Sequence, residues 1–93
     1  MLTLNEAVER MAAAVLRKHA DELVQVYRSN PTFTTNQPRK RLCSMVSHAI
    51  MVKIIEQIHC AREEGNYPLK IENMPAIKRV EHKVFEGILD RSR

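Results

Sequence analysis

The sequence contains one short arrangement of side chains that metal sites use, Glu56-Gln57-Ile58-His59. Di-iron helix bundles use two such Glu-x-x-His units together with two further inward Glu residues. A dimer would supply the second unit, but the extra carboxylates would have to come from Glu9, Glu22 or Glu81. None of these three lies on an apolar face in the sequence pattern. We therefore expect no metal and no cofactor, and we expect His59 to be a boundary residue near a helix C-terminus.

Thiol and phosphate chemistry are equally unsupported. Cys43 and Cys60 lie 17 positions apart on one expected helix, which separates them by roughly 25 Å, so we expect reduced, buried thiols. His59 and Cys60 are neighbours in sequence and point about 100° apart on a helix. The chain has two glycines, too few for a phosphate-binding loop. We expect a protein that is not an enzyme, with no catalytic residue and no small-molecule substrate.

The net charge of +4 is concentrated in one part of the chain. Acidic and basic residues cancel in residues 1–30 and again in residues 56–93. The remaining segment holds four basic residues and no acid: Arg39, Lys40, Arg41 and Lys53. The first three fall in the first turn of an expected helix, where the helix dipole disfavours each cation by roughly 0.3–1 kcal/mol. A counter-charge from outside this segment is therefore expected.

Three environments suit this basic turn. One is a phosphate or nucleic-acid backbone, which would also meet the helix amides and the neutral side chains of Thr35, Asn36 and Gln37. Another is a carboxylate patch, within the fold or on a protein partner. The third is solvent. A helix-turn-helix pattern is missing from the sequence, so base-specific reading of DNA has little support.

The pattern of apolar residues predicts an all-α domain spanning residues 1–93. Thr3 and Glu6 form a capping box at the start of a helix over about 4–29. A second helix is expected over about 38–64 and a shorter one over about 74–90, with loops at 30–38 and 65–73. Short extended segments are expected at 32–35 and 69–71. The fold class is a small bundle of two long helices and a shorter C-terminal helix.

The second expected helix is apolar nearly all round. The short third helix cannot cover it on both sides, so we expect a homodimer or a protein partner over the remaining face. A compact three-helix monomer is the alternative. The candidate docking or dimer surface comprises Met45, Ala49, Met51, Val52 and Ile55.

These observations predict a small non-catalytic regulatory, adaptor or inhibitor protein that binds a protein partner through the second helix and its basic first turn. The alternative is a dimeric nucleic-acid-binding regulator that grips phosphates with Arg39, Lys40 and Arg41. The longest apolar run, Ala49 to Val52, is far shorter than the roughly 20 residues of a membrane helix, and the first residues do not resemble a signal peptide. We therefore expect a cytoplasmic protein without membrane contact.

Overall fold

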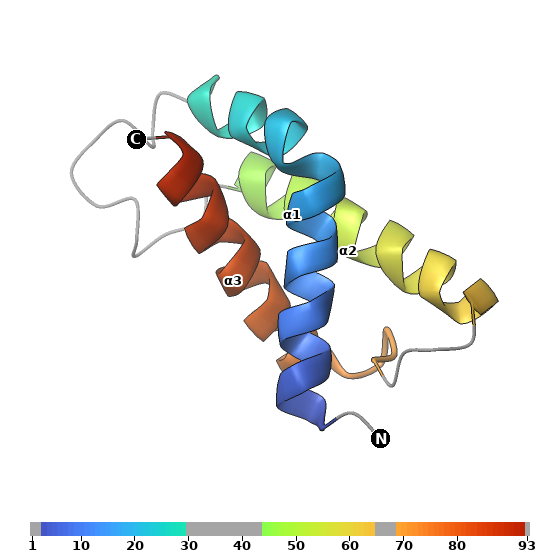
Figure 1. Cartoon of the computed structure of the whole chain (residues 1–93). Coiled ribbons are helices and arrows are strands. Elements are labelled where there is room, and N and C mark those ends of the chain that lie inside the picture. The colour runs from blue at the N-terminus through green and yellow to red at the C-terminus, as the bar shows by residue number, and fades with distance from the viewer. Residues whose placement is uncertain (1–2, 30–43, 65–68, 93) are drawn as a thin grey trace.

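The computed structural model describes residues 3–29, 44–64 and 69–92 (Figure 1). They form three α-helices: α1 (Leu4–Arg28), α2 (Ser44–Glu64) and α3 (Met74–Ser92). These ranges contain no strand, which confirms the predicted all-α bundle. None of the three helices, as described, is long and apolar enough to cross a membrane.

The extended segment expected at 69–71 is instead irregular at Leu69 and Lys70 and enters a turn at Ile71 and Glu72. The turn is closed by the Asn73 amide, which donates to the Lys70 carbonyl at 3.0 Å. The segment expected at 32–35 and the first turns of the second helix, 38–43, lie outside the described residues.

Helix α1 begins at the predicted residues Thr3 and Glu6, which form one half of the capping box. The Thr3 hydroxyl oxygen accepts a hydrogen bond from the Glu6 amide at 3.2 Å, and Thr3 Oγ1 lies 3.1 Å from Glu6 Oε1. This arrangement satisfies one of the amide donors that a helix start leaves unpaired. At the other end, the Ser29 amide donates to the Gln25 carbonyl at 2.9 Å, so the last turn closes on itself.

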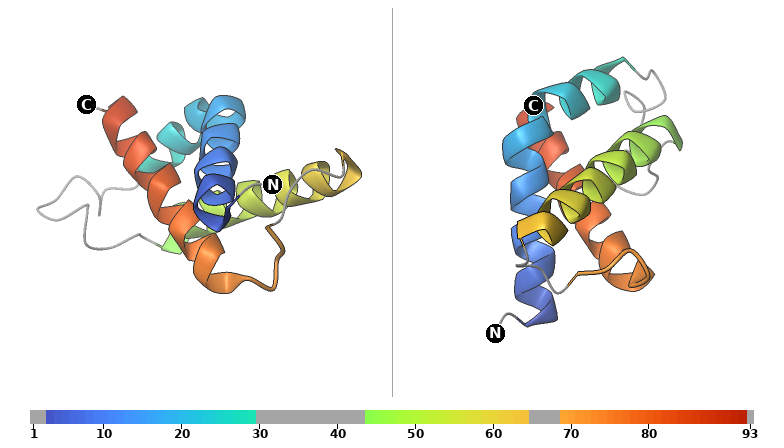
Figure 2. Two further views of the ribbon diagram at one scale, coloured as in Figure 1. Left: turned by 60° about the horizontal axis from the view of Figure 1, so that its bottom comes forward. Right: turned by 90° about the vertical axis from the view of Figure 1, so that its right-hand side faces the viewer.

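The three helices share one apolar core. Helices α1 and α3 pack most extensively on each other, and α2 lies across them and contacts α3 least (Figure 2). The largest fully buried side chains come from all three helices and from Leu69. They are Met11, Leu23, Ile50, Ile54, Ile58, Leu69, Ile77 and Ile88. The core therefore lies between an α1–α3 pair and the inner side of α2.

Polar contacts and one glycine fix how α1 meets α3. Lys83 Nζ lies 3.1 Å from the Glu9 carboxylate, and Arg79 donates to the side chain of Asn5. At the opposite end, Gly87 faces the side chain of Leu16: a Cβ at position 87 would lie 2.5 Å from Leu16 Cδ1. The absence of a side chain at Gly87 thus allows the two helices to approach closely.

Candidate interaction surface

The inner side of α2 is fixed by a row of four buried residues at every fourth position: Val46, Ile50, Ile54 and Ile58. Residues four apart lie on one side of a helix, so this row faces α1 and α3. All four are fully or almost fully buried. The opposite side of α2 is therefore turned away from the core.

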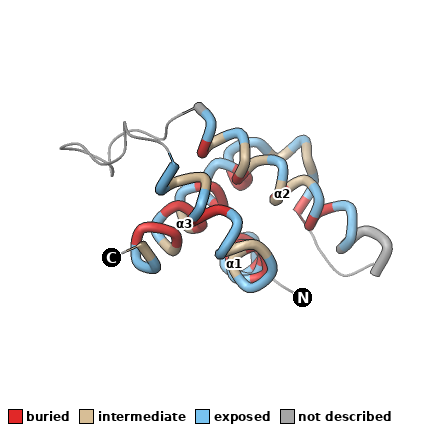
Figure 3. Tube along the Cα trace, turned by 90° about the horizontal axis from the view of Figure 1, so that it is seen from above, coloured by how far each residue is buried: buried red, intermediate tan, exposed pale blue. Residues whose placement is uncertain are grey.

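That opposite side carries what we call the outer stripe, five residues at spacings of three and four: Met45, His48, Val52, Ile55 and His59. At 3.6 residues per turn these positions fall within about 80° of one another around the helix. Met45 is 66% exposed and Val52 37% exposed. His48 and His59 are exposed and Ile55 is half-buried. Figure 3 shows buried, intermediate and exposed residues following one another along α2. The outer stripe therefore combines three apolar side chains with two imidazoles.

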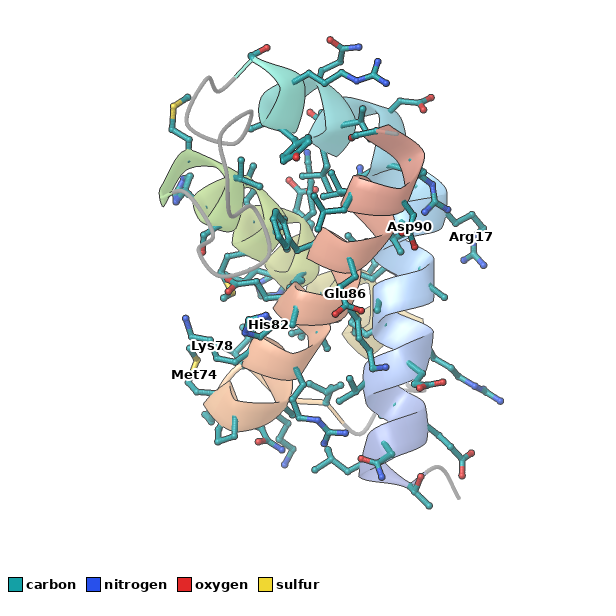
Figure 4. All side chains as sticks on the ribbon, turned by 90° about the vertical axis from the view of Figure 1, so that its left-hand side faces the viewer. Arg17, Met74, Lys78, His82, Glu86 and Asp90 are labelled. Carbon is teal, nitrogen blue, oxygen red and sulfur yellow. The ribbon has the colours of Figure 1, made fainter. Side chains whose placement is uncertain are left out.

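The outer side of α3 differs in character. Figure 4 shows Met74, Lys78, His82 and Glu86 along it, one turn apart, and all four are exposed. Charged and polar residues on the outward side are the ordinary pattern of a surface helix. Large exposed apolar residues within the described part of the chain are Leu4, Met45, Val52 and Met74. Met45 and Val52 lie on one helix side, so α2 carries the more continuous apolar surface.

The structure divides the predicted docking residues into two groups. Met45, Val52 and Ile55 belong to the outer stripe. Ala49 and Met51 are half-buried and pack against the core. Their role in docking stays a prediction, but part of their surface is already covered within the chain.

Lys53 forms ion pairs within the fold. Its ammonium lies 3.0 Å from the Glu22 carboxylate on α1 and 3.6 Å from Glu56 one turn further along α2. The hydrogen bond to Glu22 is the main reason why the pKa of Lys53 lies above its ordinary value of 10.5; the charges of both carboxylates act in the same direction, and burial opposes them. A phosphate or partner carboxylate would have to compete with these two ion pairs.

An open hollow lies at the N-terminal end of the outer stripe. Its volume is about 420 Å³. It is lined by Met45, by three residues near the C-terminal end of α1 and by the C-cap of that helix: Glu22, Gln25, Val26 and Ser29. Met45 thus forms one wall of a depression as well as one end of the stripe.

The remaining predicted binding residues lie outside the described residues. These are Thr35, Asn36, Gln37, Arg39, Lys40 and Arg41. Their contribution to the net charge follows from the described residues. Across residues 3–29, 44–64 and 69–92, 11 basic and 11 acidic side chains cancel. The surplus of +4 therefore belongs to Arg39, Lys40, Arg41 and Arg93.

Glu81 was expected away from any apolar face, and that expectation is wrong. The residue is 3% exposed, on the same side of α3 as Ile77 and Phe85, which lie four positions before and after it. Its carboxylate accepts a hydrogen bond from the Ser47 hydroxyl of α2 at 3.0 Å. This spacing from two apolar residues is the signal that identifies Glu81 as inward-facing.

The Glu-x-x-His unit does not gather with other ligands. Glu56 is 52% exposed and His59 is exposed on the outer side of α2, whereas Glu81 is buried against Ser47. In the described part of the chain no three His, Cys, Asp or Glu residues are placed to hold a metal ion. Cys60, expected to be buried, is instead an exposed free thiol.

In the described part of the chain, the candidate functional site is therefore the outer stripe of α2, which combines apolar side chains with two imidazoles. Comparison of the sequence with protein-family models and with curated proteins, and of the structure with solved structures, finds no match.

Proposed function

We propose that this chain is a small non-catalytic regulatory, adaptor or inhibitor protein of the cytoplasm, which acts by binding protein through the outer stripe of α2. The observation that supports this is the exposure of Met45 and Val52 on one side of a helix whose other side is buried. Apolar residues grouped on an exposed surface are typical of protein-binding sites. The hollow beside Met45 gives this surface a depression that a partner side chain can fill.

The basic residues Arg39, Lys40 and Arg41 have a second role in this proposal. They carry most of the charge surplus of the chain, and the sequence places them directly before α2. This charge would attract a partner that covers the outer stripe and presents carboxylates near the N-terminal end of α2. Such attraction raises the rate of association more than it raises the affinity.

The test is affinity capture from the source cells with three baits: the wild type, Val52→Glu and Ala13→Glu. Ala13 is exposed on α1, so it controls for an added surface charge elsewhere. We expect the wild type and Ala13→Glu to capture the same proteins, and we expect Val52→Glu to lose them. Retention of the same proteins by all three baits, or by none, would overturn the assignment of the outer stripe.

The positive charge of Arg39, Lys40 and Arg41 favours a second candidate function. In this alternative the chain is a nucleic-acid-binding regulator, and these three residues bind phosphates. Binding through phosphates weakens steeply with salt. This function predicts measurable binding to duplex DNA or RNA at about 50 mM salt, lost in the variant with all three residues replaced by Gln. Undetectable binding of the wild type at that salt concentration rules it out.

A further inference from the structure

We propose that the outer stripe of α2 pairs with the same stripe of a second copy of this chain, with the two α2 helices antiparallel about a two-fold axis at Val52. This inference rests on the proposed function, because it takes the outer stripe as the interaction surface and names its partner.

The two ends of the outer stripe lie at equal distances from Val52. Met45 lies seven positions before Val52 and His59 seven positions after it, about 10 Å in either direction along the helix. A two-fold axis at Val52 therefore lets the stripe of one copy face that of the other over its full length of about 21 Å. Contacts of this self-complementary kind are the commonest way in which soluble proteins form dimers.

Charge selects the antiparallel arrangement. His48 lies one turn before Val52 and Glu56 one turn after it, and both are exposed. An antiparallel pair brings the His48 imidazole of each copy to the level of the Glu56 carboxylate of the other, where its N–H can donate. A parallel pair would instead place the two Glu56 carboxylates at the same level, which is unfavourable for like charges.

The imidazole–carboxylate pairs also favour Val52 as the position of the two-fold axis. An axis between Lys53 and Ile54 would bring Val52 to the level of Ile55 and His48 to the level of His59. That register retains apolar contacts but removes the two imidazole–carboxylate pairs. The axis at Val52 keeps both pairs and keeps the apolar centre.

Side-chain size agrees with this register. Ala49 and Ile55 lie three positions on either side of Val52, so the small side chain of one copy reaches the level of the large side chain of the other. A small residue that faces a large one lets the side chains of two helices interdigitate. At the ends, His59 of one copy reaches the level of Met45 of the other, beside the open hollow.

The described residues leave this side of α2 accessible. Figures 1 and 2 show α1 and α3 on one side of α2, and the C-terminal part of α2 extends beyond them. A pair of single helices buries less surface than a standard protein interface, and interfaces of that size are weak and transient. We expect a monomer–dimer equilibrium that responds to protein concentration.

Disulfide trapping tests the axis directly. In a background with Cys43 and Cys60 both replaced by Ser, Val52→Cys places one thiol of each copy at the axis, within the Cα separation that a disulfide needs. We expect Val52→Cys to form a covalent dimer under mild oxidation with glutathione disulfide at least about tenfold faster than Ala13→Cys, the exposed control on α1. Equal rates for the two variants overturn the proposed axis.

A charge exchange tests the direction of the helices. We expect His48→Glu to weaken the dimer about tenfold, because the new carboxylate at position 48 of each copy then faces the Glu56 carboxylate of the other. Adding Glu56→Lys should return the dissociation constant to within about threefold of the wild type. Sedimentation equilibrium from about 1 µM to about 500 µM gives these constants; no recovery in the double variant overturns the antiparallel pairing, as does a wild type that remains monomeric throughout.

The outcomes separate this inference from the proposed function. A chain that stays monomeric but captures proteins through Val52 contradicts the dimer and leaves the proposed function intact. A chain that forms the Val52-centred dimer but captures no protein in a Val52-dependent way supports the dimer and contradicts binding of another protein.

Discussion

The Ser47 hydroxyl of α2 donates a hydrogen bond of 3.0 Å to the buried Glu81 carboxylate of α3. The pair lies where α2 and α3 meet, and Val46 and Ile50 of α2 are buried beside it in the sequence. A buried carboxylate without a donor is costly. We infer that this hydrogen bond reinforces the rotation of α2 that buries Val46 and Ile50 and leaves the outer stripe exposed.

Removal of the Ser47 hydroxyl should therefore destabilise the fold. We expect Ser47→Ala to lower the free energy of unfolding by about 1–3 kcal/mol, because Glu81 loses its donor while remaining buried. Urea denaturation measures this. The double variant Ser47→Ala/Glu81→Leu should recover most of the loss, since no buried polar group remains without a partner. A double variant less stable than Ser47→Ala contradicts this explanation.

The ion pairs of Lys53 predict a dependence of stability on alkaline pH. The pKa of Lys53 is raised in the folded chain, chiefly by its hydrogen bond to Glu22. A raised lysine pKa stabilises the fold fully below the ordinary value of 10.5, and the contribution disappears as the pH rises through the folded pKa. Melting temperatures between about pH 8 and pH 11.5 should thus differ between wild type and Glu22→Gln, and the difference should shrink above pH 10.5.

Glu56→Gln is the matched control for that experiment. The Glu56 carboxylate lies 3.6 Å from the Lys53 ammonium, further than the Glu22 carboxylate at 3.0 Å. The Glu56→Gln change therefore removes the weaker of the two ion pairs. It should lower the melting temperature less than Glu22→Gln does. Equal effects of the two variants, or a difference that stays constant across the pH range, would contradict the role given to Glu22.

Close contact of α1 with α3 predicts the effect of filling position 87. A Cβ there meets Leu16, so we expect Gly87→Ile to lower the free energy of unfolding by about 1–3 kcal/mol through overpacking. Leu16→Ala in the same chain should relieve part of that loss by making room. Urea denaturation of the two single variants and the double variant forms the required cycle, and strictly additive losses would show that the two side chains do not collide.

Neighbouring residues on opposite sides of α2 should respond differently to truncation. Ile54 is fully buried, and Ile54→Ala should cost about 2–5 kcal/mol through the lost contacts and the cavity. Val52 is exposed, and Val52→Ala should change the stability of the monomer by no more than about 0.5 kcal/mol. Thermal or urea unfolding at low protein concentration measures both. A large loss for Val52→Ala would mean that this residue is part of the core.

The helices were largely predictable from the sequence because local rules determine them. Apolar residues at spacings of three and four and the capping residues Thr3 and Glu6 act over a few positions. The expected extended segment at 69–71 has the same alternation as a strand, but the Asn73–Lys70 hydrogen bond folds the following residues into a turn. Alternation of apolar and polar residues over three positions does not distinguish a strand from a turn.

Contacts between helices were harder to predict. Lys53 was counted with the surplus positive charge because its closest partner, Glu22, lies on another helix, beyond the reach of rules about residues three or four apart. Glu81 was assigned to the surface because of its charge, although its neighbours at four-residue spacing are apolar. The exposure of Met45 and Val52 depends on how α2 is rotated in the bundle, which residue spacing within α2 leaves undetermined.

The central claim is that the outer stripe of α2 is an interaction surface that pairs with itself. Amide NMR spectra of the wild-type chain, recorded from about 20 µM to about 1 mM, test it most directly. We predict concentration-dependent shifts centred on Val52 and extending to Met45 and His59, with Lys78 and Glu86 on the outer side of α3 unchanged. Spectra that do not change with concentration, or shifts centred on α3, would contradict the claim.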